Sequence, residues 1–284
     1  MARRRRGGGV AALLVLLLAG AAAVVWGPSL WSRYSDEVLP SGRCTVTLGE
    51  RTDTKTAEQA NNIAIIVAGS IRNGLPARAA SIAVATAIQE SSLRNIDYGD
   101  RDSVGLFQQR PSQGWGTVEE IMDPYYSTDR FYEGLEKIAN WTELEITVAA
   151  QAVQRSAFPD AYADHEEEGR LWASALTGNG GDVACDLGAA PTTTARAFSD
   201  RIAADFGEGV YELLVGAMDA EATTLTTTDG EAALEAALQR WAVAVADVEG
   251  VLGAGQGEVA WLRDEESAAP DLETDATRIT LRTS

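Results

Sequence analysis

One segment, residues 77–91, constrains the fold of this 284-residue chain more than any other. It follows a proline, which is favoured in the first turn of a helix, and it is apolar on nearly every side when wound at 3.6 residues per turn. A helix that is apolar all round is normally enclosed by other elements, and its many alanines let those neighbours approach closely. The segment therefore predicts a mainly helical domain assembled around residues 77–91.

The flanking sequence supplies further helices for this domain. Thr56 and Gln59 form a capping-box pattern, and an apolar stripe then runs to a stop signal at Asn73-Gly74. Residues 95–116 are rich in Gly, Asp, Ser, Gln and Pro, which indicates a long polar loop. Helical periodicity returns in four later segments: 118–122, 129–139, 145–155 and 161–175. We expect residues 52–186 to form one mainly α domain.

The last third of the chain has a different pattern. A linker at 187–194 precedes residues 195–284, where helical segments at 195–206 and 231–247 are followed by strand-like segments at 258–262 and 278–282. This order predicts a small α+β domain. It is strongly acidic, which leaves a protein partner in the cell envelope as one possible role.

The N-terminus indicates export. Residues 10–26 are uncharged and apolar and follow four arginines, a pattern typical of a single transmembrane helix with residues 1–9 in the cytoplasm. The small residues at 21–23 leave a cleaved signal peptide as the alternative, in which case the protein is secreted. In both cases the bulk of the chain is extracytoplasmic, and residues 27–51 are expected to be a linker next to the membrane.

Export determines the expected oxidation state of the two cysteines. In an oxidising compartment Cys44 and Cys185 most simply form one disulfide that brackets the helical domain, and two buried thiols are the alternative.

Composition removes several classes of chemistry. A chain with one histidine and two cysteines has too few of these ligands to build a His/Cys metal site, and His165, the one histidine, lies in a polar run typical of a solvated helix end. The net charge of −19 argues against nucleic acid as a partner. We therefore expect no metal and no cofactor, and carboxylate chemistry remains.

Glu90 is the carboxyl in the least polar surroundings. Helical spacing places it on the same face as Ala80, Ala83 and Ala87, at the end of the apolar segment. Desolvation and the negative end of the helix dipole both raise the pKa of a carboxyl at that position. A carboxylic acid that stays protonated is the general acid that glycosidic cleavage requires. The alternative is that Glu90 reaches solvent or pairs with Arg94 one turn later.

Two motifs resemble a known family. Glu90-Ser91 and Gly-Leu-Phe-Gln at 105–108 are similar to the Glu-Ser and Gly-Leu-Met-Gln motifs of lytic transglycosylases and goose-type lysozymes. The resemblance implies a lysozyme-like fold, cleavage of the bond between N-acetylmuramic acid and N-acetylglucosamine in peptidoglycan, and Glu90 as catalytic acid. The residues then expected to bind substrate are Ser91, Tyr98, Gly105, Leu106, Phe107, Gln108 and Gln151.

The sequence departs from the family at one position that matters. Gln151 stands where the family has a tyrosine that hydrogen-bonds the catalytic acid. Gln151 or Gln154 would have to supply the polar partner instead, and the departure leaves open a non-catalytic wall-binding protein or scaffold with a degenerate groove. If water is the attacking group, a second carboxylate is needed, and Asp100 or Asp102 would supply it. The alternative for both aspartates is a role in turns and caps.

Aromatic residues complete the expected groove, because sugar rings pack on flat aromatic faces. Trp115, after the Gln motif, and Tyr125 are the candidates for this role. In the C-terminal part, the surroundings of Trp241 and Trp261 have a faint resemblance to a domain attached to actinobacterial wall hydrolases. That part contains no histidine with which to hold a zinc ion.

Overall fold

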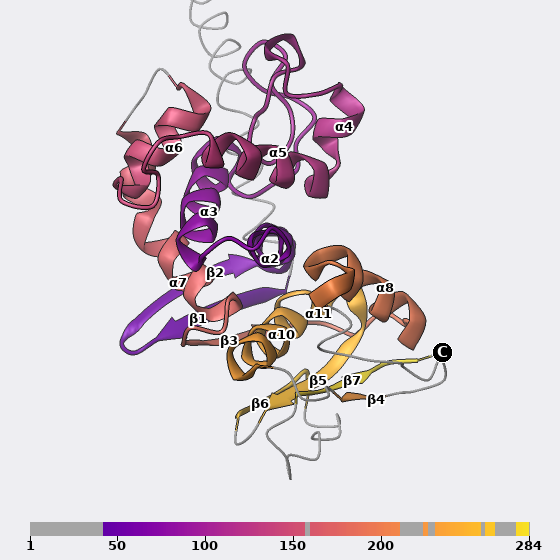
Figure 1. Ribbon diagram of the computed structural model, residues 1–284. Coiled ribbons are helices and arrows are strands. Elements are labelled where there is room, and N and C mark those ends of the chain that lie inside the picture. Colours follow the sequence, from indigo (N-terminus) through magenta and orange to yellow (C-terminus); the bar gives the residue numbers. More distant parts are fainter. Residues whose placement is uncertain are drawn as a thin grey trace, which may run out of the picture. The chain divides into compact units, whose positions relative to one another are not determined.

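The computed structural model describes residues 42–156, 160–210, 224–226, 231–256, 259–264 and 277–283, and residues 42–284 cluster as one compact unit (Figure 1). The expected tail, the apolar segment at 10–26 and most of the expected linker lie outside the described residues. Within the described residues no helix is both long and apolar enough to cross a membrane.

Helix α3 (Ala77–Ser91) lies at the centre of the first part of the chain, as the sequence predicts (Figure 1). It is buried on almost every side and packs against five other helical elements. These neighbours are α2 (Ala57–Arg72), α5 (Pro124–Glu136), α6 (Ile146–Gln154), the short 3-10 helix η2 (Ala161–His165) and α7 (Glu166–Leu176). Two short elements lie in and after the polar loop: the 3-10 helix η1 (Pro111–Gln113) within it and α4 (Val118–Met122) behind it.

A small antiparallel sheet flanks these helices. It contains β1 (Arg43–Leu48), β2 (Arg51–Thr56) and β3 (Asp182–Asp186), in the order β2-β1-β3. Strand β1 lies inside the range 27–51 that the sequence analysis assigned to a linker, so the linker ends earlier than expected. Cys44 and Val46 alternate with polar residues and point into the core, but five of the twelve residues in β1 and β2 are threonines, which obscures the apolar pattern.

The disulfide between Cys44 and Cys185 is confirmed. The two residues are directly paired in the register of β1 and β3. The bond therefore joins the beginning and the end of the first part of the chain across adjacent strands.

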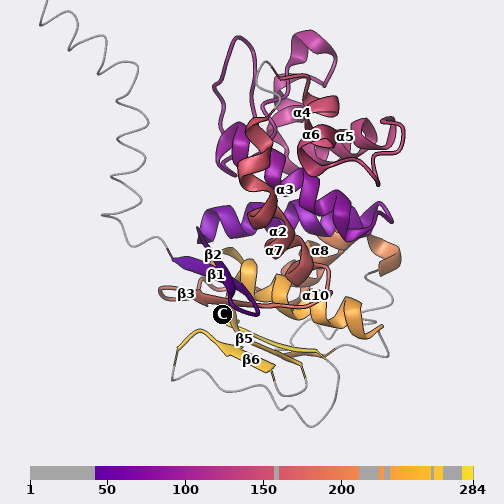
Figure 2. The same ribbon diagram turned by 90° about the vertical axis from the view of Figure 1, so that its left-hand side faces the viewer.

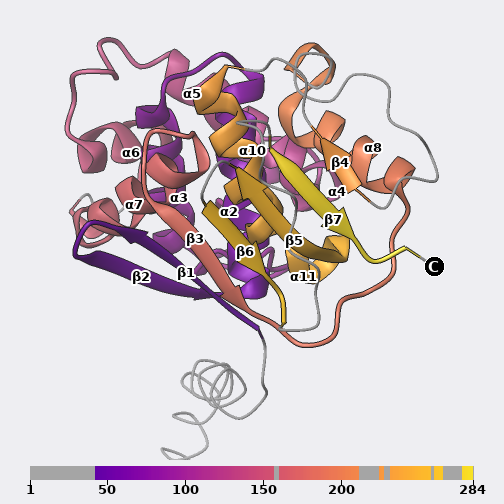
Figure 3. The same ribbon diagram turned by 90° about the horizontal axis from the view of Figure 1, so that it is seen from below.

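The second part mixes helices and strands, as predicted. Helices α8 (Ala195–Phe206), α10 (Ala232–Ala244) and α11 (Ala246–Glu249) accompany four strands: β4 (Thr224–Thr226), β5 (Val251–Gln256), β6 (Val259–Leu262) and β7 (Arg278–Leu281). The strands form an antiparallel sheet in the order β4-β7-β5-β6, and α10 lies across one face of it (Figures 2 and 3). Strand β5 was not predicted, because its two glycines interrupt the apolar pattern.

The two parts share one hydrophobic core. Helix α10 packs on α2, α7 and β3, and the Trp261 indole nitrogen donates to the Cys185 carbonyl at 2.9 Å. Asp205 lies at the same junction and is fully buried. Its carboxylate accepts hydrogen bonds from the Tyr125 hydroxyl at 2.6 Å, Arg201 Nε at 2.9 Å and Trp241 Nε1 at 2.6 Å. Tyr125, a candidate for the groove, thus contacts this junction.

Candidate functional site

The end of helix α3 positions Glu90. The chain leaves the helix through two successive residues with left-handed backbone angles, Ser92 with φ of 52° and Leu93 with φ of 60°. Side-chain amides from α2 hold this turn: Gln59 donates to the Ser92 carbonyl at 2.9 Å and Asn62 to the Leu93 carbonyl at 2.8 Å. Left-handed angles are unfavourable for such residues, and they persist only where the surroundings fix the backbone. The last helical turn is therefore held in one orientation.

Glu90 is half-buried, and the partners described for its carboxyl are uncharged. The Tyr162 hydroxyl donates to Glu90 Oε1 at 2.6 Å. Burial raises the pKa of Glu90 above its usual value of 4.5, and hydrogen bonds from Tyr162 and Gln154 lower it by less. The ion pair with Arg94 that the sequence left open is not among the described contacts of Glu90. The arrangement favours the protonated form of this carboxyl over a wider pH range than in water.

Tyr162 is the residue that sequence reasoning missed. It lies in η2, eleven residues beyond Gln151, and is fully buried. Burial raises the pKa of Tyr162, and the neighbouring Glu90 carboxylate raises it further, so the phenol stays protonated and donates. A hydroxyl group thus meets the acid from a different element than the family pattern implies. No local motif marks it, because a single tyrosine in a polar run carries no signal of which helix end it faces.

The Glu90 side chain opens into a pocket of about 560 Å³. Of the residues predicted for substrate binding or as a second carboxylate, Gln108 and Asp100 line this pocket with it. The other lining residues are mostly polar and come from the loop after α3 and from the end of α6: Arg101, Ser103, Gln109, Arg110, Gln113, Trp115, Gln154, Arg155 and Ser156. Trp115 therefore lies in the pocket, where the sequence analysis expected a groove aromatic.

The predicted loop at 105–108 forms one wall of the pocket through Gln108. Gly105 has φ of 80°, and a Cβ there would lie 2.8 Å from the Ile121 carbonyl oxygen, so the position requires glycine. Gln108 also has a left-handed φ, of 47°, and its side-chain amide lies 3.3 Å from the carbonyl oxygens of Tyr98 and Gly105. These contacts fix the direction in which the Gln108 carboxamide faces the pocket.

Three of the residues predicted to bind substrate lie behind the pocket. Leu106 and Phe107 are fully buried, and the Phe107 ring stacks on Phe131 with centroids 4.6 Å apart. The Ser91 hydroxyl, also buried, donates to the Leu106 carbonyl at 2.7 Å. Ser91 thus ties the end of α3 to the loop, and Leu106 and Phe107 anchor that loop in the core.

Two further predicted residues lie apart from the Glu90 carboxyl. Gln151 donates to the Ser156 carbonyl at 2.8 Å and so holds the chain after α6. The side chain of Tyr98 is exposed, with 65% of the residue accessible to solvent. Neither residue lines the Glu90 pocket.

The two aspartates of the polar loop differ in their surroundings. Asp102 accepts hydrogen bonds from Arg110 at 2.9 Å and from the backbone nitrogen and hydroxyl of Ser112 at 2.8 and 3.0 Å. These donors hold the pKa of Asp102 well below its usual range, which makes it a weak base. Asp100 lines the pocket, and its side chain is 88% exposed.

The described residues contain no cluster of His, Cys, Asp and Glu that could hold a metal ion. His165 lies between Gln89 and Glu168, at 3.2 and 3.5 Å, and neither contact is a serine hydroxyl.

No model of a known protein family matches the chain, and no curated protein sequence matches it either.

Proposed function

We propose that this protein cleaves the glycan strands of peptidoglycan between N-acetylmuramic acid and N-acetylglucosamine, with Glu90 as general acid. The observation that carries the proposal is the environment of Glu90: an acid with a raised pKa and uncharged hydrogen-bond partners, at the edge of a polar pocket. The Glu-Ser and Gly-Leu-Phe-Gln motifs support the same chemistry, because they resemble those of lytic transglycosylases and goose-type lysozymes. A lysozyme-like fold for the helical part belongs to this proposal.

In the proposed reaction the Glu90 carboxyl donates its proton to the glycosidic oxygen as the bond to the muramyl C1 breaks. The leaving sugar takes that proton, and Glu90 becomes a carboxylate. Tyr162 and Gln154 then donate to a full negative charge, which strengthens their hydrogen bonds as the reaction proceeds. They orient the carboxyl before the step and stabilise the carboxylate after it.

The second half of the reaction has two possible nucleophiles. In a transglycosylase the 6-hydroxyl of the same muramyl residue attacks C1, and its proton passes to Glu90, which gives a 1,6-anhydro product and restores the acid. In a hydrolase water attacks, and a second carboxylate accepts its proton. Asp100 is better suited to that role than Asp102, because it borders the pocket while Asp102 is held by Arg110 and Ser112. We favour the transglycosylase, which needs no second carboxylate.

The proposed setting is the outer face of the cell membrane. The apolar segment at 10–26 would tether the enzyme beside the wall if it is retained, and would direct secretion if it is cleaved. The C-terminal part shares its core with the helical part, and a partner in the envelope remains a proposal for its outer surface.

Product analysis tests the proposal. The protein and its Glu90→Gln variant are incubated with purified peptidoglycan, and the released muropeptides are identified by mass spectrometry. Anhydro-muropeptides from the unaltered protein alone support the transglycosylase. Reducing ends from the unaltered protein alone support the hydrolase, and Asp100→Asn should then abolish release.

The competing function is a wall-binding protein without turnover. Its main support in the sequence was the missing tyrosine at position 151, but Tyr162 now supplies a hydroxyl to Glu90 from another element. Binding of peptidoglycan by both proteins, with no soluble product from either, would decide for the non-catalytic function.

A further inference from the structure

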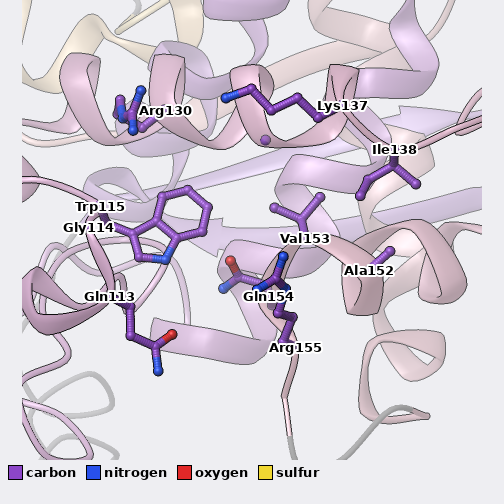
Figure 4. Close-up of a pocket in the computed structure, with 11 residues that line it drawn as sticks. Gln113, Gly114, Trp115, Arg130, Lys137, Ile138, Ala152, Val153, Gln154 and Arg155 are labelled. Atoms are coloured by element: carbon purple, nitrogen blue, oxygen red, sulfur yellow. The ribbon is translucent and has the colours of Figure 1, made fainter.

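A second pocket adjoins the one that contains Glu90. It has a volume of about 630 Å³ and shares four lining residues with the Glu90 pocket: Gln113, Trp115, Gln154 and Arg155. A strand of linked sugars that enters one pocket can therefore continue into the other past Trp115. Figure 4 shows Arg130 and Lys137 on one side of the second pocket and Gln154 and Arg155 on the other, with the Trp115 ring between them.

One face of α5 builds the wall of this second pocket. Arg130 and Gly134 lie in α5, and Lys137 caps its C-terminal end. Their spacings of four and three residues place them on the same side of the helix. A Cβ at Gly134 would lie 3.4 Å from the Trp115 ring and 3.1 Å from a methyl of Val153. Glycine is unfavourable inside a helix, and here it leaves room for the Trp115 ring.

The charge of the second pocket is opposite to that of the protein. Arg130, Lys137 and Arg155 line it, and none of its lining residues is acidic, whereas the chain as a whole has a net charge of −19. Arg130 pairs with Glu133 on its own helix. In the described part of the chain neither Lys137 nor Arg155 forms an ion pair. Two cations therefore face the pocket without a compensating carboxylate.

We propose that this second pocket is a subsite for a carboxylate carried by the glycan, so that the substrate is a strand with acidic substituents and not a neutral one. The inference rests on the proposed function and specifies its substrate. Lys137 and Arg155 supply charge-assisted hydrogen bonds to the carboxylate, and Trp115 supplies a flat apolar face for the sugar ring that bears it. In peptidoglycan that carboxylate has two sources: the stem peptide, or the lactyl group of a muramyl residue from which the peptide has been removed.

Binding measurements test the subsite separately from turnover. The full chain in detergent carries Glu90→Gln in every sample, so that no ligand is cleaved. Three tetrasaccharide probes are titrated and followed by calorimetry: one with stem peptides, one with the peptides removed so that the lactyl carboxylates are free, and chitotetraose, which has no carboxylate. A preference for the first probe over the second assigns the carboxylate to the stem peptide, and the reverse assigns it to the lactyl group.

Variants of Lys137 identify the group that confers the preference. Lys137→Glu should weaken binding of the preferred anionic probe about tenfold or more, and Lys137→Arg should restore it, because arginine keeps the charge. Chitotetraose should bind equally to all three proteins. Arg196→Glu is the matched control, since it makes the same change in charge at an exposed position of α8, outside both pockets.

The outcomes separate the two proposals. If chitotetraose binds as tightly as both anionic probes, or if Lys137→Glu weakens all three probes equally, the carboxylate subsite is wrong while cleavage by the unaltered protein can still occur. If the unaltered protein releases no product but Lys137→Glu selectively weakens the anionic probe, the subsite stands and the catalytic function fails.

Discussion

Two carboxylates with opposite surroundings lie in the two parts of this molecule. Asp205, at the junction with the C-terminal part, is fully buried and accepts hydrogen bonds from Arg201, Tyr125 and Trp241. Glu90, at the end of the central helix, is half-buried and is held by Tyr162 and Gln154, neither of which is charged. One site has a cation to balance its carboxylate, and the described contacts of the other include none.

The hydrogen-bond partners of each carboxyl indicate whether it stabilises the fold or can take part in a reaction. The Asp205 carboxylate has donors on both oxygens, one of them the Arg201 guanidinium, so its hydrogen-bonding capacity is used within the fold. A carboxyl with neutral donors and little solvent holds its proton more readily, and the adjoining pocket offers space for a substrate. We therefore expect substitution at Asp205 to change stability and substitution at Glu90 to change reactivity.

The largest expected effect is that of Glu90→Gln on turnover. The amide keeps the shape of the side chain but has no acidic proton, and general acid catalysis commonly contributes about 10²–10⁴-fold to a rate. We expect the initial rate of muropeptide release to fall by about 10³-fold or more, with the far-ultraviolet circular dichroism spectrum unchanged. A loss of less than tenfold would show that another group donates the proton.

Asp205→Asn should produce the converse result. In this variant Glu249 is the remaining carboxylate partner described for Arg201. Breaking a buried ion pair by removing one partner costs about 3–5 kcal/mol. We expect this loss in the free energy of unfolding by urea, with muropeptide release per folded molecule unchanged. Asp200→Asn, an exposed position of the same helix, is the control and should leave stability nearly unchanged. If Asp205→Asn removes activity from the folded protein, the division of roles between the two acids is wrong.

Tyr162→Phe should change the pH dependence of the reaction. The hydroxyl of Tyr162 lowers the pKa of Glu90, so its removal raises that pKa further. Because Glu90 must be protonated to act, the alkaline limb of the rate profile should move to higher pH.

Tyr132→Phe is the matched control for this shift. The Tyr132 hydroxyl is equally buried but donates to the Ile66 carbonyl, away from the Glu90 pocket. This variant should lose some stability but should leave the alkaline limb in place. An unchanged limb in Tyr162→Phe would show that the hydrogen bond does not influence the acid during turnover.

The sequence predicted the pocket residues that neighbouring residues in the chain mark out. Glu90 was found because one charged residue at the end of an apolar helix stands out, and Trp115 because it follows the Gln motif. Gln154 was one of the two glutamines that the sequence offered as a polar partner, whereas Tyr162 was not predicted, because only the packing of η2 against α3 brings it to Glu90. The resemblance placed Gln151 in the groove, but a side chain three residues later on the same helix contacts the acid.

In the fold, too, features set by local sequence were predictable, and features set by contacts between distant segments were not. The central helix and the capped α2 were predictable from periodicity and capping residues, and the pairing of Cys44 with Cys185 from the expected compartment. The antiparallel three-stranded sheet was not predicted, because β1 and β2 are rich in threonine and β3, the partner of β1, lies far along the chain. Nor could the sequence indicate that Tyr125 contacts Asp205, since that contact depends on how α8 docks on the helical part.

The smallest expected effect is on stability, and it comes from Glu90 itself. The folded-state pKa of Glu90 lies above the value of 4.5 for an unperturbed glutamate, so between the two values the folded protein binds more protons than the unfolded chain. The contribution of Glu90 to stability therefore falls as the pH rises through this window. Glu90→Gln does not titrate, and above this window its Tm should exceed that of the unaltered protein.

Below pH 4.5 the advantage of Glu90→Gln should vanish, because the unaltered side chain is then protonated in both states. In a Tyr162→Phe background the decline in Tm should extend to higher pH, since the pKa of Glu90 is higher there. If the difference in Tm between Glu90→Gln and the unaltered protein is the same at every pH, the folded state does not raise the pKa of Glu90. The contrast with Asp205 would then rest on the neighbouring pocket alone, and the acid would owe its reactivity to a bound substrate.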